Sequence, residues 1–237
     1  MYGLYYDPTY ILLIPAIIFT LFAQAKVKSA YRKYSGVPNM RGITGMQAAR
    51  RILDANGLQN VRIEMTPGML SDHYDPRDRV MRLSADVYND TSIAAVSIAA
   101  HESGHAIQHA TGYGLLKFRN TIVPVVNIAS KLSWPLLIIG LIIASAGSLS
   151  TGYLIFDIGV LFFAGVVVFH LVTLPVELNA SRRAIIQMQE LGIVGMDEVR
   201  GSKKVLSAAA MTYVAAMISA VLQLLRLVLI FGRRNDD

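Results

Sequence analysis

The residues of this 237-residue chain that could do chemistry are concentrated in one segment, HESGHAIQHA, residues 101–110. It contains three of the five histidines, His101, His105 and His109, and a glutamate, Glu102, follows the first. The first five residues fit the pattern H-E-x-x-H. Residues four apart lie on one face of a helix, so His101 and His105 could bind one Zn²⁺. Glu102 would then serve as general base for a water activated by zinc, which is the chemistry of peptide-bond hydrolysis.

The alternative to a metal site is a helix whose histidines are satisfied by ordinary hydrogen bonds. Two features of the surrounding sequence favour the metal. Capping residues in YNDTS, 88–92, predict a helix over 92–110, and the small residues of AAVSIAA, 94–100, permit close packing behind it. His109 continues the spacing, but it lies ~12 Å from His101 along the helix. We therefore expect His109 at the surface or supporting a ligand, rather than binding the metal itself.

A catalytic zinc needs a third protein ligand and an open fourth position. The chain has no cysteine, so the ligand must be His, Asp or Glu. The candidate is Glu177 in LPVELNASRRA, residues 174–184, which directly follows a long apolar segment. Without the motif upstream, the preferred interpretation of Glu177 would be an acid at the membrane interface that pairs with Arg182 or Arg183.

The composition indicates a membrane protein. Hydrophobic residues make up 54% of the chain, charged residues only 16%, and the mean hydropathy is +0.46. Basic residues follow the first apolar segment instead of preceding it, which favours an uncleaved anchor over a signal peptide. The second and third apolar segments are joined by SLSTG and predict a helical hairpin. The four segments that could span a bilayer are 10–25, 132–147, 153–174 and 208–232.

The distribution of basic residues predicts the orientation. Of the 22 Lys and Arg residues, all but three fall in two regions, 26–131 and 182–204. The positive-inside bias places both regions in the cytoplasm. The net charge of +6 is thus explained by topology, and no basic motif interleaved with aromatic residues predicts nucleic-acid binding.

We therefore predict a mainly α membrane protein with about four transmembrane helices and a zincin-like cytoplasmic lobe that contains a short β-hairpin or small sheet. The lipid bilayer and a protein or peptide substrate are the expected partners, and a homo-oligomer or partner membrane proteins stay possible. The predicted segments are an N-terminal anchor, 1–25; the lobe, 26–131; a transmembrane hairpin, 132–176; a cytoplasmic helix with the third ligand, 177–207; and a C-terminal transmembrane helix with a short tail, 208–237.

Two short strands are predicted in the lobe, over 61–65 and 79–84, with a loop over 67–78 between them. Either strand could be an edge that pairs with an extended substrate, or both could form an ordinary packed hairpin. The loop carries His73 and Tyr74. Each is a candidate for stabilising the oxyanion of the transition state, and each could equally order the loop by hydrogen bonds.

HESGHAIQHA, followed about seventy residues later by PVELNASRRA, resembles the YugP-like family of membrane neutral zinc metallopeptidases. The resemblance extends over nearly the whole chain. It implies a zinc peptidase of the bacterial membrane. Our leading hypothesis is therefore a membrane-anchored endopeptidase that holds one Zn²⁺ and acts on membrane or membrane-proximal proteins. The resemblance also implies that Glu177 is the third ligand.

A more distant likeness is to membrane gluzincins, which carry E-x-x-x-D on the helix of the third ligand. Here Ser181 stands at the Asp position. We therefore expect another acceptor to orient His101 or His105, and Asp86 or Asn179 could serve. Ser181 itself is also a candidate for supporting the site from beside the ligands.

Two other functions are compatible with parts of the sequence. An intramembrane zinc protease of the site-2 type would use an aspartate such as Asp157 as its third ligand. However, only eight residues separate 88–92 from His101, too few for a span. A non-catalytic membrane scaffold with a structural zinc is the second alternative, although such a site has no use for a base at Glu102.

Overall fold

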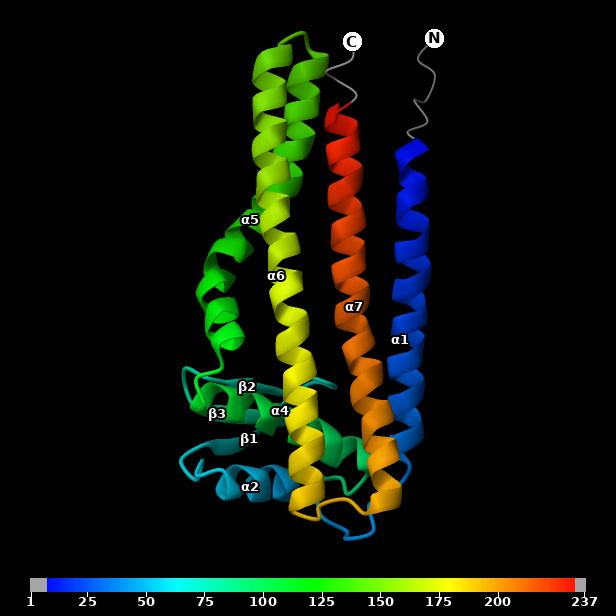
Figure 1. Cartoon of the computed structure of the whole chain (residues 1–237), viewed down its shortest axis with the longest axis vertical. Coiled ribbons are helices and arrows are strands. Elements are labelled where there is room, and N and C mark those ends of the chain that lie inside the picture. The colour runs from blue at the N-terminus through cyan, green and yellow to red at the C-terminus, as the bar shows by residue number, and fades with distance from the viewer. Residues whose placement is uncertain (1–7, 233–237) are drawn as a thin grey trace. The chain divides into compact units, whose positions relative to one another are not determined.

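The structure is a computed structural model and describes residues 8–232 of the chain (Figure 1). The chain divides into two compact units. Within the described residues, the helical unit comprises 8–22, Phe118–Leu174 and 213–232, and the sheet unit comprises Ala23–Lys117 and Pro175–Thr212.

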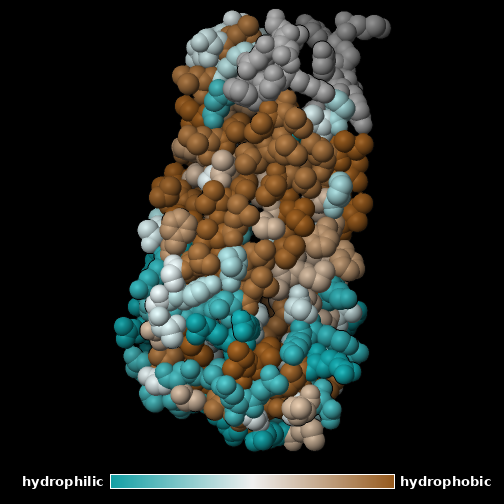
Figure 2. Space-filling view, viewed as in Figure 1, coloured by the Kyte–Doolittle hydropathy of each residue, from teal (hydrophilic) through white to brown (hydrophobic). Residues whose placement is uncertain are grey.

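Within residues 8–232, four helices are long and apolar enough to cross a membrane, which confirms the predicted number. Each is longer than the apolar segment that predicted it, because the helix continues into more polar sequence. Apolar side chains cover most of the helical unit's visible surface (Figure 2). The four are the 3₁₀ helix η1 (Pro8–Leu12) with α1 (Leu13–Ser35), α5 (Gly114–Ser145), α6 (Leu149–Glu190) and α7 (Met196–Gly232).

Within the helical unit, α5 and α6 form the predicted hairpin and pack through glycines. A Cβ at Gly140 would lie 2.6 Å from the backbone nitrogen of Phe156, and one at Gly152 would overlap the backbone of Ala144. Small residues at these positions let the two backbones approach, as in other helix pairs in membranes. The packing of the hairpin therefore depends on these glycines as well as on apolar composition.

The sheet unit contains a mixed three-stranded sheet in the order β1-β3-β2. β1 (Arg62–Thr66) pairs in parallel with β3 (Val80–Ser84), and β2 (His73–Asp75) pairs antiparallel with β3. The prediction of a loop over 67–78 was wrong in part, because this segment contains β2, which at three residues is too short for a periodic pattern to reveal. Of the two candidate edge strands, 79–84 corresponds to the central strand β3, whereas 61–65 corresponds to the edge strand β1. The alternative of a packed hairpin of these two strands was wrong, because β1 and β3 pair in parallel.

The helix that carries the motif, α4 (Ile93–Ala110), matches the predicted bounds within one residue, and the Ser92 side chain caps it by accepting from Ala95 N at 3.1 Å. One face of α4 packs on the sheet, where Ala99 and Ala106 join a cluster with Met81 and other buried residues. Its small side chains allow this close approach, as the sequence predicts.

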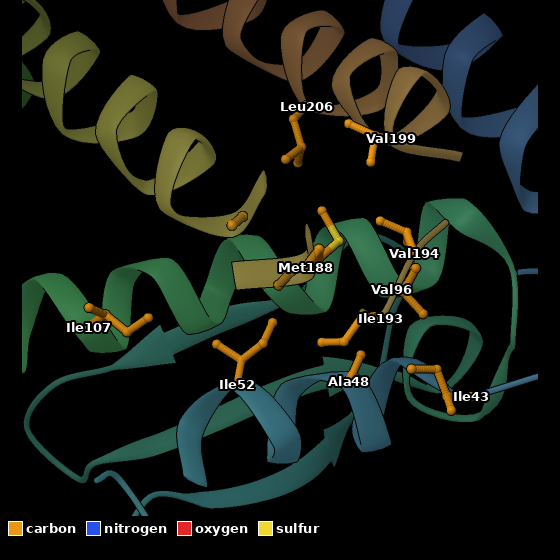
Figure 3. Close-up of a cluster of buried hydrophobic side chains, with 12 residues drawn as sticks. Ile43, Ala48, Ile52, Val96, Ile107, Met188, Ile193, Val194, Val199 and Leu206 are labelled. Carbon is orange, nitrogen blue, oxygen red and sulfur yellow. The ribbon is translucent and has the colours of Figure 1, made fainter. Parts of the chain in front are cut away.

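An adjacent face of α4 belongs to a second cluster, drawn in Figure 3. This cluster joins α4 to α2 (Gly45–Ala55) and to the parts of α6 and α7 that lie in the sheet unit. It therefore fixes α4 against the stretch of α6 that carries Glu177. Its members include Ile52, Val96, Ile107, Met188, Val199 and Leu206.

The helix that carries Glu177 is a continuation of the third predicted span. α6 runs unbroken through Pro175 to Glu190, and the next break is the turn before α7, where Gly192 has a φ of +57°. The predicted cytoplasmic helix, 177–207, therefore falls on two helices. Proline within a long apolar helix is tolerated when neighbouring groups satisfy the freed carbonyl.

Candidate metal centre

Three side chains from two helices converge at one point in the sheet unit. His101 and His105 lie on α4 and Glu177 lies on α6, and one ligand atom from each lies within 4.8 Å of the others. Glu177 Oε2 is 3.2 Å from His101 Nε2 and 3.4 Å from His105 Nε2. Ligands ~2.0–2.1 Å from one tetrahedral zinc lie roughly 3.3 Å from each other. Two imidazoles and a carboxylate at these separations fit a zinc ion.

A glycine permits this convergence. Gly104 lies between the two histidines on α4, and a Cβ there would lie 2.5 Å from the carbonyl oxygen of Ala180 on α6. The two helices therefore touch through their backbones next to the candidate ligands. Any larger residue at 104 would separate α4 from α6 and draw Glu177 away from the imidazoles.

Glu102 lies beside this group but is not part of it. Its side chain is buried, and its Oε2 accepts a hydrogen bond of 3.0 Å from the backbone N–H of Tyr74 in β2. Burial raises the pKa of Glu102 to about 7. The nearby charge of His101 opposes the rise, whereas the charges of Glu177 and Asp72 add to it. A carboxyl group that titrates near neutrality suits a general base.

His101 is oriented by Ser181, the residue at the position where membrane gluzincins carry an aspartate. Ser181 Oγ lies 3.1 Å from His101 Nδ1, so that Nδ1–H can donate to the hydroxyl while Nε2 faces Glu177. Ser181 is one turn beyond Glu177 on the same helix. Within the described residues, the Nδ1 atoms of the two imidazoles contact Ser181 and Gln108, rather than Asp86 or Asn179. The serine at the aspartate position reaches His101 itself.

His105 is oriented by Gln108, a residue that the sequence analysis missed. Gln108 Oε1 lies 3.0 Å from His105 Nδ1. The Gln108 side-chain amide donates to Val176 O at 2.8 Å and to Asn179 Oδ1 at 3.0 Å, which fixes its orientation. Asn179 therefore supports His105 indirectly, by fixing the side chain of Gln108. The spacing of three residues between His105 and Gln108 on one helix was the signal available.

The remaining predicted site residues lie around β2. His73 is exposed, and its Nδ1 lies 2.8 Å from the carbonyl oxygen of Ser71, a contact that orders the loop. The phenol oxygen of Tyr74 lies 2.9 Å from His109 Nδ1. His109 is outside the group of three candidate ligands and instead holds the strand that positions Glu102.

Replacement of Ser181 by alanine should weaken zinc binding roughly 10- to 100-fold, because the His101 imidazole loses the acceptor that fixes its orientation. Competition with a chromogenic chelator measures the affinity. Ser207→Ala is the matched control, since Ser207 is an exposed serine on α7 whose hydroxyl donates a hydrogen bond to the carbonyl of Lys204 on the same helix. Equal zinc affinity in both variants would show that Ser181 does not support the ligand.

Comparison with known proteins agrees with this geometry. Residues 9–232 match the model of a protein family described as "Putative neutral zinc metallopeptidase". A relative from Bacillus subtilis (strain 168), named "Putative membrane protease YugP", is 48% identical over 226 residues, which cover 95% of this chain and 97% of the relative. No solved structure matches the chain. The chain belongs to the family that this model describes.

Proposed function

We propose that the protein is a membrane-embedded zinc-dependent endopeptidase that cleaves membrane or membrane-proximal proteins, with His101, His105 and Glu177 as the ligands of one zinc ion. The observation that carries the proposal is the separation of 3.2 and 3.4 Å between Glu177 Oε2 and the two imidazole nitrogens. Membership of the family supports the zinc ion, and the four apolar helices support a location in the membrane.

Bound zinc supplies Lewis-acid polarisation of the scissile carbonyl and makes water more acidic. Glu102 takes the proton from the attacking water and gives it to the leaving amine. The Tyr74 N–H donates to Oε2 of Glu102 and so holds that carboxyl in place. Ser181 and Gln108 keep the two imidazoles turned toward the ligand group.

Two observations favour this proposal over an intramembrane protease. α4 is not among the helices of residues 8–232 that are long and apolar enough to span a membrane. The carboxylate near the imidazoles is Glu177, whereas Asp157 belongs to the helical unit. A purely structural zinc site would not explain why Glu102 is buried beside the ligands and hydrogen-bonded by a strand.

The basic residues of 26–131 and 182–204 favour an orientation with the metal centre at the cytoplasmic face. This orientation is part of the proposal. It predicts substrates whose cleavage sites lie in the cytoplasm close to the bilayer.

Removal of the metal should abolish proteolysis by the detergent-solubilised full-length chain. Treatment with 1,10-phenanthroline is expected to stop cleavage of casein or of a membrane-protein substrate, and stoichiometric Zn²⁺ should restore it. Mg²⁺ should not restore it, because two imidazoles do not suit that ion. Cleavage by metal-free protein would refute the proposal. Protein that binds zinc yet cleaves neither class of substrate would favour the scaffold.

A further inference from the structure

The sheet unit contains a cavity of about 590 Å³ that the proposed catalysis does not use. One face of α1, the loop between β1 and β2, and α7 line it. We propose that this cavity, here called the α1 groove, binds an anionic phospholipid from the membrane. Its walls include Val27, Lys28 and Arg32 of α1, Met69 and Leu70 of the loop, and Thr212 of α7.

The cations of the groove suit a phosphate group. Lys28 and Arg32 are four residues apart on α1, so both side chains lie on one face of the helix. Neither forms an ion pair within residues 8–232. Like charges at this spacing repel each other, and an anion between them removes the repulsion. Arg32 can also bind a phosphate with two parallel hydrogen bonds.

The apolar side chains of the groove indicate a ligand with an apolar part, and not a free anion. Met69 and Leu70 are 72% and 53% exposed, although both are large and apolar. Leu70 also has a φ of +53°, a conformation that side chains with a Cβ rarely adopt. The loop therefore holds two apolar side chains in the open at a conformational cost. A phospholipid acyl chain would cover them, whereas inorganic phosphate would not.

The position of the groove along α1 matches the headgroup region, if α1 spans the bilayer as proposed. The large exposed apolar residues of α1 end at Phe22, and Lys28 follows six residues later. At 1.5 Å per residue this is about 9 Å along the helix. A lysine or arginine at this level attracts the anionic lipids of the cytoplasmic leaflet.

Lipid binding is tested on the full-length Glu102→Gln protein, so that the result does not depend on proteolysis. The delipidated protein is incubated in detergent with equal amounts of phosphatidylglycerol and phosphatidylcholine, and retained lipid is measured by native mass spectrometry. The parent should prefer phosphatidylglycerol. Arg32→Gln should reduce that preference roughly fivefold and Lys28→Gln/Arg32→Gln about 30-fold, at ~1 kcal/mol for each cation.

Lys33→Gln is the matched control, because Lys33 lies next to Arg32 on α1 but does not line the groove. It should leave the preference unchanged. Met69→Ser/Leu70→Ser should weaken retention of both lipids. Equal retention of the two lipids by the parent, equal effects of Arg32→Gln and Lys33→Gln, or displacement of phosphatidylglycerol by millimolar inorganic phosphate would each overturn the inference. Each would leave the proposed peptidase untouched, since no readout measures cleavage.

Discussion

Glu102→Gln should abolish proteolysis while the protein keeps its zinc. The amide has nearly the shape of the carboxylate, and its oxygen can still accept the hydrogen bond from the Tyr74 N–H. It cannot accept the proton of the attacking water, so the turnover number should fall by at least ~10²- to 10⁴-fold. Peptide cleavage and zinc content, measured on the same purified sample, check both halves of the expectation.

Glu190→Gln is the matched control for Glu102→Gln. Glu190 is an exposed glutamate at the end of α6 that accepts a hydrogen bond from Gln187, so the same chemical change there should leave both zinc and cleavage intact. A Glu102→Gln protein that cleaves as fast as the parent would remove Glu102 from catalysis. Loss of zinc from that protein would instead make Glu102 a metal ligand.

The parts of the fold that local sequence determines were predicted well. Composition alone identifies the four apolar helices, because a bilayer span requires a long run of apolar residues. The capping serine and the small residues before His101 predict α4 to within one residue. The pair His101 and His105 follows directly from helical spacing, since residues four apart share a face.

The parts that depend on tertiary contacts could not be predicted in this way. Nothing near Gly104 in the sequence shows that its missing side chain lets α4 touch the backbone of Ala180. Ser181 looks like the loss of an aspartate until α6 brings its hydroxyl to His101 Nδ1. The short strand β2 exists because Tyr74 and its neighbours pair with β3, and three residues carry no periodic signal of their own.

The same limit applies to Glu177, which the sequence left open as either a metal ligand or a partner of Arg182 or Arg183. Its carboxylate oxygen lies 3.2 Å from His101 Nε2 and 3.4 Å from His105 Nε2. Arg183 instead donates to the side-chain oxygen of Asn179. The tertiary contact therefore favours the ligand role, and a metal-content measurement can decide it.

Glu177→Ala should lose zinc and remain folded. Two imidazoles from one helix are a poor site alone, because a catalytic zinc needs three protein ligands. The variant also removes a buried carboxylate, so the metal-free fold gives up no apolar packing. We expect at least ~100-fold weaker zinc binding, more than the loss of a residue that only orients a ligand. Zinc content by mass spectrometry and helicity by circular dichroism distinguish metal loss from unfolding.

Asp157→Ala is the decisive comparison for Glu177→Ala, because an aspartate on a membrane span would be the third ligand in an intramembrane protease. Asp157 belongs to the helical unit, whereas the two histidines belong to the sheet unit. Asp157→Ala should therefore retain its zinc and its activity. The reverse pattern, with zinc kept by Glu177→Ala and lost by Asp157→Ala, would move the third ligand into the membrane. Because each variant removes one carboxylate from the same helix, general damage to α6 would affect both, and only a difference between them identifies the ligand.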